Sequence, residues 1–125
     1  MQFKYQDITE KIIRAFYNVY NTLDYGFLEK VYGNVLMLEL KLMNLECEKL
    51  KQIRVFYKSH NVGEYFANII VENKVIIEIK AAEGIIEEHG NQLLNYLKAT
   101  EIEVGLLLNF GKKPQFKKTN FRKRI

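Results

Sequence analysis

The residues best suited to chemistry lie in one short run, Val75-Ile76-Ile77-Glu78-Ile79-Lys80. Residues two apart in a β-strand point to the same face, so Glu78 and Lys80 would project together. A carboxylate can hold a divalent cation that neutralises phosphate charge and activates water. A neighbouring ammonium can stabilise developing negative charge. The pair therefore suits phosphodiester chemistry, and the alternative is an ordinary ion pair on an exposed strand.

A further polar residue is expected beside this pair. The run 62–71 predicts a strand, and a short turn after it would return the chain along 75–81. Asn68 and Glu64 share the same parity, so either would project from the strand that neighbours Glu78. The carbonyl oxygen of an asparagine is a neutral ligand for a hard cation, weaker than a carboxylate. The alternative is a polar residue that faces solvent.

Two helices are expected before these strands. Apolar residues recur at three- and four-residue steps between Ile8 and Leu23, which predicts a helix that begins at Asp7. Asp7 and Glu10 have the spacing of a capping box. A second helix is expected over 27–43. Its predicted apolar face consists of Leu28, Val31, Val35, Leu38 and Leu42.

The remaining elements complete an α/β fold. They are expected as strands at 50–57, 62–71 and 75–81, a helix at 85–100, a strand at 104–110 and an edge strand within 116–121. The run 104–110 is almost wholly apolar, as in a strand that is covered on both faces. The order ααβββαβ, with one optional last strand, predicts a central mixed sheet flanked by helices.

Composition limits the class of protein. The chain has 125 residues, of which 48% are hydrophobic, so a single domain over 1–125 with a buried core is expected. The one cysteine, Cys47, excludes an internal disulfide, and two histidines make a structural zinc site improbable. No apolar run is long enough to span a bilayer, and the first seven residues lack the long apolar stretch of a signal peptide. A cytoplasmic protein is expected.

Positive charge is concentrated in the last 14 residues, 112–125. The rest of the chain carries 12 basic and 15 acidic residues, a net charge of −3. A basic tail on a mildly acidic body predicts a polyanionic partner, and the alternative is a solvated, frayed terminus. The candidate nucleic-acid contacts are Lys112, Lys113, Lys117, Lys118, Arg122, Lys123 and Arg124.

Several motifs in chain order resemble one protein family. Gly26-Phe27-Leu28-Glu29-Lys30-Val31-Tyr32 matches the GxxExxY motif, and the likeness continues through Glu78-Ile79-Lys80-Ala81, 89–100 and 104–111. The chain thus resembles the GxxExxY proteins, a family assigned to the PD-(D/E)XK nuclease superfamily. The resemblance implies binding of DNA or another nucleic acid and a Mg²⁺ or Mn²⁺ cofactor. It implies catalytic positions at Glu29, Asn68, Glu78, Lys80 and Gln92, of which Glu29, Asn68 and Glu78 would ligate the metal.

One position departs from the family pattern. The family has an aspartate, the main metal ligand of the superfamily, where this chain has Asn68. Three explanations stay open. The chain is an inactive relative, or Glu64 or Glu72 has become the ligand, or the residue was replaced deliberately.

Three functions follow from these observations. The first is a metal-dependent nuclease, a hydrolase impaired by Asn68. The second is a nucleic-acid-binding module that keeps the fold and has lost the chemistry. The third is a protein-interaction module, for example a homodimer through the aromatic-rich first helix. The aromatic residues behind that idea are Phe3, Tyr5, Phe16, Tyr17, Tyr20 and Tyr25.

Overall fold

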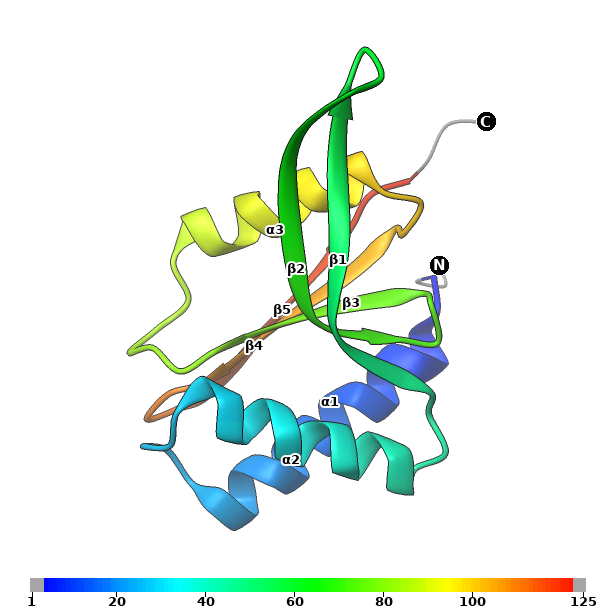
Figure 1. Ribbon diagram of the computed structural model, residues 1–125. Helices are drawn as coiled ribbons and strands as arrows, with labels where there is room; N and C mark the ends of the chain where they lie inside the picture. Colours follow the sequence, from blue (N-terminus) through cyan, green and yellow to red (C-terminus); the bar gives the residue numbers. More distant parts are fainter. Residues whose placement is uncertain (1–3, 123–125) are drawn as a thin grey trace.

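The computed structural model describes residues 4–122, and for 50–53 and 65–68 it describes the backbone alone. The predicted order of elements is confirmed, including the optional last strand (Figure 1). The elements are α1 (Gln6–Leu23), α2 (Glu29–Leu42), β1 (Cys47–Tyr57), β2 (His60–Val71), β3 (Val75–Lys80), α3 (Glu87–Ala99), β4 (Val104–Phe110) and β5 (Pro114–Asn120).

The five strands form one mixed sheet in the order β1-β2-β3-β4-β5. All neighbours are antiparallel except β3 and β4, which run parallel from Val75↔Val104 to Lys80↔Asn109. Parallel neighbours need a crossover connection, and α3 supplies it. The C-terminal ends of β3 and β4 therefore lie side by side at the same end of the sheet.

Helices cover both faces of the sheet. Helices α1 and α2 lie on one face and α3 on the other (Figure 1). Ile77 and Ile79 of β3 belong to the core under α1 and α2, whereas Ile76 packs with Leu93 and Leu97 of α3. Strand β4 is buried along its whole length, as the apolar run predicted. Even-numbered residues of β3 thus point toward the α3 face.

Helix α1 buries the predicted stripe, but its start differs. It begins at Gln6 after Tyr5, a left-handed residue with φ 55°, and no side chain caps it. The predicted capping box at Asp7 and Glu10 is therefore wrong. Asp7 lies inside the first turn, where a carboxylate still interacts favourably with the helix dipole.

The aromatic residues of α1 serve the interior of the fold. Phe16 is fully buried and meets the ring of Phe110 edge-on at 4.8 Å between centroids. Tyr17 contacts the ring of Phe116 in β5, and the Tyr20 hydroxyl lies 2.9 Å from the carbonyl oxygen of Gly111. Of the residues proposed for a homodimer, Phe3 lies outside the described residues. Tyr17 and Tyr20 of α1 make contacts within the chain, whereas Tyr25 is 51% exposed, so the described residues offer less aromatic surface than that prediction assumed.

The predicted apolar face of α2 is wrong at three of its five positions. Leu28, Leu38 and Leu42 are 76%, 59% and 71% exposed, whereas Val31 and Val35 are partly buried. The buried stripe is instead Tyr32, Gly33, Leu36 and Leu40. The helix carries two apolar stripes, and the one that contains Tyr32 packs into the core. The Tyr32 ring stacks on Phe110 with centroids 4.2 Å apart, and Gly33 lies against Ile79, where a Cβ would be in ordinary contact at 3.6 Å from Ile79 Cδ1.

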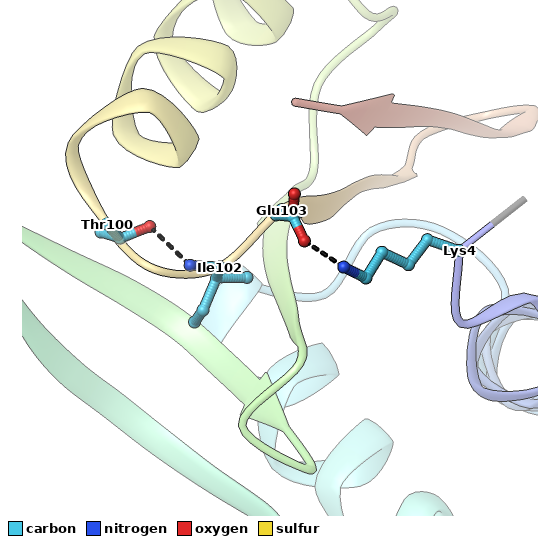
Figure 2. A network of polar contacts seen from close by, with 4 residues as sticks. All are labelled: Lys4, Thr100, Ile102 and Glu103. Carbon is cyan, nitrogen blue, oxygen red and sulfur yellow. Dashed lines mark hydrogen bonds and ion pairs between the residues drawn. The ribbon is translucent and has the colours of Figure 1, made fainter. Parts of the chain in front are cut away.

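The N-terminal segment is tied to the entrance of β4 (Figure 2). Lys4 forms an ion pair with Glu103, and this hydrogen-bonded carboxylate raises the pKa of the Lys4 ammonium. Close by, Thr100 Oγ1 accepts a hydrogen bond from the Ile102 N–H at 3.3 Å. This network lies where β4 begins, at the opposite end of the sheet from Lys80.

The basic C-terminal segment is mostly a strand. β5 pairs with β4 along its full length, from Val104↔Asn120 to Phe110↔Pro114. A frayed terminus is therefore wrong for residues 114–120, and the predicted edge strand is confirmed. None of the described helices is long and apolar enough to cross a membrane.

Candidate functional site

Glu78 and Lys80 lie on the α3 face at the C-terminal end of β3. Both side chains are partly exposed, whereas Ile77 and Ile79 beside them in the strand are buried. Their partners in the parallel strand β4 are Leu107 and Asn109. Alternation along the strand brings the carboxylate and the ammonium to one face, at the point where the chain leaves the sheet.

Position 68 lies in β2, next to β3. The described antiparallel pairing ends at Ile69↔Ile77, so positions 68 and 78 are each the next residue beyond the last pair. The side chain of Asn68 lies outside the described residues. The backbone thus brings together the two strand positions that the sequence singled out.

Neither alternative carboxylate lies at this point. Glu64 is four residues from position 68, about 13 Å along an extended strand. Glu72 follows β2 at the opposite end of β3, where its Oε2 accepts a hydrogen bond from the Glu46 N–H at 2.8 Å. In this structure neither carboxylate lies beside Glu78.

Glu29 lies near the same end of the sheet, but on the other face. It is the exposed first residue of α2, one helical turn before Gly33, which packs on Ile79. Tyr32, in the same turn, stacks on Phe110 at the end of β4. The start of α2 therefore lies near the ends of β3 and β4 (Figure 1), but on the side of α1. Glu29 and Glu78 therefore lie near the same end of the sheet, on opposite faces.

The GxxExxY motif has a structural role in this chain. The buried Tyr32 hydroxyl donates to the carbonyl oxygen of Asp24 at 2.5 Å and accepts from the Phe27 N–H at 3.2 Å. Gly26 adopts φ 112°, a conformation that favours glycine. Tyr32 thus fixes the loop before α2 and, with it, the position of Glu29.

A clamp that the sequence interpretation missed holds the exit of β3. We call Asn109, Gly111 and Ala82 the Ala82 clamp. The buried Asn109 side chain donates to the carbonyl oxygen of Ala82 at 3.0 Å and accepts from its N–H at 2.9 Å. A Cβ on Gly111 would lie 2.3 Å from the same carbonyl oxygen. Ala82 is two residues after Lys80, so the clamp fixes the segment that carries Lys80. The signal in the sequence was an asparagine inside the apolar run 104–110.

Helix α3 covers the face on which Glu78 and Lys80 lie. Its Leu93 packs on Gly105, where a Cβ would come within 2.9 Å of Leu93 Cδ2. Gln92, the predicted helical glutamine, is exposed on this helix. His89 Nδ1 accepts from the Ile86 N–H at 3.4 Å, so this histidine caps the helix.

The sheet divides the predicted basic cluster. Lys117 lies on the α3 face, where its Nζ would be 2.8 Å from a Cβ at Gly90. Lys118 lies on the other face, with its Nζ 3.4 Å from Thr9 Oγ1, and burial lowers the pKa of its ammonium. Lys112, Lys113 and Arg122 are exposed. Lys123 and Arg124 lie outside the described residues.

A hard divalent cation such as Mg²⁺ takes several oxygen ligands. Among the residues that the structure describes, no group of three or more acidic, histidine or cysteine side chains can hold a metal ion. Glu78 offers one carboxylate, Glu29 lies across the sheet, and position 68 is an amide. The described donors therefore do not complete a cation site.

The comparisons with known proteins agree with the fold. Residues 6–123 match the model of the PD-(D/E)XK nuclease superfamily. No curated protein matches the chain. The crystal structure of SSO0001 is similar, with a TM-score of 0.60 and 18% identity, over 97% of this chain and 62% of that one. At this identity the likeness concerns the fold, and this chain spans less than two thirds of that protein. The narrower GxxExxY resemblance stays a prediction. Since the superfamily model covers nearly the whole sequence, the chain belongs to the PD-(D/E)XK nuclease superfamily.

Proposed function

We propose that this chain is a nuclease-like protein that binds DNA on its α3 face and whose phosphodiester hydrolysis is impaired by Asn68. One observation carries the proposal: Glu78 and Lys80 project from the end of β3 on one face, beside the strand position 68. A carboxylate and an ammonium in this arrangement suit the hydrolysis of a phosphodiester, the reaction of the superfamily.

The proposed roles follow from the chemistry of each group. Glu78 would be the principal ligand of Mg²⁺ or Mn²⁺. Glu29, at the same end of the sheet on the other face, would be the second candidate for an acidic ligand. Lys80 would stabilise negative charge on the phosphate, and Gln92 would orient the substrate. A bound cation would neutralise phosphate charge. Because the amide of Asn68 is a weak ligand for a hard cation, metal affinity should be low.

Cleavage assays test the proposal. We would incubate single-stranded, duplex and branched DNA with Mg²⁺ or Mn²⁺ and three proteins: the unaltered chain, Asn68→Asp, and Asn68→Asp with Lys80→Ala. Asn68→Asp should cut, because it restores a carboxylate beside Glu78, and the added Lys80→Ala should abolish cutting. Asn44→Asp is the matched control, since it adds the same charge to an exposed residue after α2, away from the C-terminal end of β3 and from the surface proposed for DNA.

Two results would contradict the hydrolytic part. If the unaltered chain already cuts as fast as Asn68→Asp, another group supplies the ligand and Asn68 does not impair hydrolysis. If no variant cuts although each is folded and binds DNA, the chemistry is not recoverable at position 68.

The second candidate function is a nucleic-acid-binding module without catalysis. Asn68 and the incomplete set of metal donors in the described part of the chain favour it. It predicts DNA binding that is independent of Mg²⁺ and unchanged by Asn68→Asp, apart from a small loss from the added negative charge.

A further inference from the structure

Strands β1 and β2 extend beyond the rest of the sheet as a hairpin arm, which we define as residues 54–64. β1 and β2 pair as far as Tyr57↔His60, whereas the described pairs between β2 and β3 begin at Ile69↔Ile77. Figure 1 shows this arm projecting from the body of the molecule. A two-stranded hairpin by itself is only marginally stable in water, so an arm of this length adds little to the stability of the fold.

The tip of the arm exposes large apolar side chains. Phe56, Tyr57 and Val62 are 59%, 62% and 60% exposed. They flank a two-residue turn at Lys58 and Ser59, whose φ angles are 49° and 65°. Single exposed apolar residues are common, but two aromatic rings and a valine at one projecting tip mark a contact surface.

The polar chemistry of the tip favours a nucleic acid. Residues 55–63 contain no acid, and Lys58 holds its ammonium 5.4 Å from the centre of the Tyr57 ring. Exposed aromatic rings beside positive charge bind single-stranded nucleic acids, because each unpaired base offers a flat face for stacking and each phosphate a negative charge. Bases inside a duplex are already stacked and offer no such face.

The arm continues the face on which the proposed site lies. Glu48 pairs with Ile70, which belongs to the core under α3. Alternation along β1 then brings Arg54 to that same side, the side of Glu78 and Lys80, before the register shifts between Val55 and Phe56. Phe56 and Tyr57 are consecutive and so point to opposite sides of the tip, where each ring offers a face for one base, and Arg54 lies between the tip and the candidate site.

We infer that the hairpin arm binds unpaired nucleotides through Phe56 and Tyr57 and thereby selects single-stranded segments. The inference rests on the proposed function, because it names the substrate class that the same face would receive.

Binding measurements test it. We would titrate the full chain into a fluorescently labelled oligothymidylate and a duplex of equal length, and follow anisotropy. Phe56→Ala and Tyr57→Ala should each weaken single-strand binding by about fivefold to a hundredfold, the usual effect of removing one stacked ring. Duplex binding should change little. Tyr25→Ala is the matched control, because Tyr25 is 51% exposed but precedes α2 on the opposite face.

A spectroscopic variant gives a direct readout. The chain has no tryptophan, so Phe56→Trp would carry the single one at the arm. Stacking on a base should quench its fluorescence when oligothymidylate is added and should preserve the affinity that Phe56→Ala loses. Thermal unfolding of each variant would verify that the fold is intact.

The outcomes separate the inference from the proposed function. If the chain binds neither probe, the proposed function fails and the inference with it. If it binds DNA but Phe56→Ala and Tyr57→Ala have no effect, or weaken both probes equally, the inference alone is overturned. If these variants leave DNA affinity unchanged and instead dissolve a self-associated form, the arm is a protein contact, which also overturns it.

Discussion

The Ala82 clamp ties the candidate site to the interior of the molecule through single residues. Lys80 lies beside Asn109 in the neighbouring strand, and Asn109 binds both backbone groups of Ala82. Gly111 leaves room for the Ala82 carbonyl oxygen. A partly exposed charged residue thus takes its position from a fully buried amide.

The clamp leads to a stability prediction. Asn109→Ala should lower the free energy of unfolding by about 2–3 kcal/mol, because two hydrogen bonds are lost inside the protein. Gly111→Ala should cost about 1–3 kcal/mol, because the backbone must move to relieve the overlap. Gly63→Ala is the control, since a Cβ there meets nothing within 4 Å. Urea unfolding measures all three, and equal stability of the two glycine variants would contradict the clamp.

Cys47 leads to a prediction of pH dependence. It lines a pocket of about 540 Å³ together with Lys41, Glu46 and Glu72. Burial raises the pKa of its thiol, so the reactive thiolate is scarcer at a given pH than in a free cysteine.

Alkylation of Cys47 by iodoacetamide should therefore be slower than that of a cysteine peptide at about pH 8. The rate should continue to rise at pH values where the peptide has levelled off. Mass spectrometry of the intact chain over a pH series measures this. A rate equal to that of the peptide near neutral pH would contradict the effect of burial.

Helix α2 is the element in which two patterns compete. The stripe of Leu28, Leu38 and Leu42 and the stripe of Tyr32, Leu36 and Leu40 lie on different sides of the helix, and only the second is buried. The buried stripe carries the ring that stacks on Phe110.

Two neighbouring leucines test this assignment. Leu40→Ala should destabilise the protein by about 2–5 kcal/mol, because it leaves a cavity in a packed core. Leu38→Ala removes the same atoms from an exposed position and should change stability by no more than about 0.5 kcal/mol. Thermal and urea unfolding compare them, and similar losses for both would mean that Leu38 is covered in solution.

At the scale of the whole molecule, the sheet separates the basic residues into two surfaces. Lys117 and Lys118 are adjacent in β5 but lie on opposite faces. Deletion of residues 112–125 would remove β5 and expose one side of β4, so it would unfold the protein and say little about binding. Single substitutions are the appropriate test.

Lys117→Ala should weaken DNA binding and reduce the slope of log affinity against log salt by about one, because one phosphate contact is lost. Lys118→Ala should leave both nearly unchanged, because that side chain lies on the α1 side of the sheet beside Thr9. Affinities measured across a salt series give both quantities. Equal losses for the two lysines would mean that the α3 face is not the binding surface.

The sequence by itself determined what depends on local backbone geometry. Alternation along a strand requires Glu78 and Lys80 to share a face, and the apolar run 104–110 identified β4 at its observed bounds. Helical and strand periods predicted the order of the elements because each period is a property of one segment alone.

Only the tertiary structure decided how those segments meet. Periodicity could not choose between the two stripes of α2, because the choice depends on the surface of the sheet opposite. Periodicity also could not reveal that Glu29 and Glu78 lie near the same end of the sheet on opposite faces. Nor could it reveal that Asn109 binds Ala82, 27 residues away in the chain. Contacts between distant segments depend on how several surfaces fit at once, and no single segment contains that information.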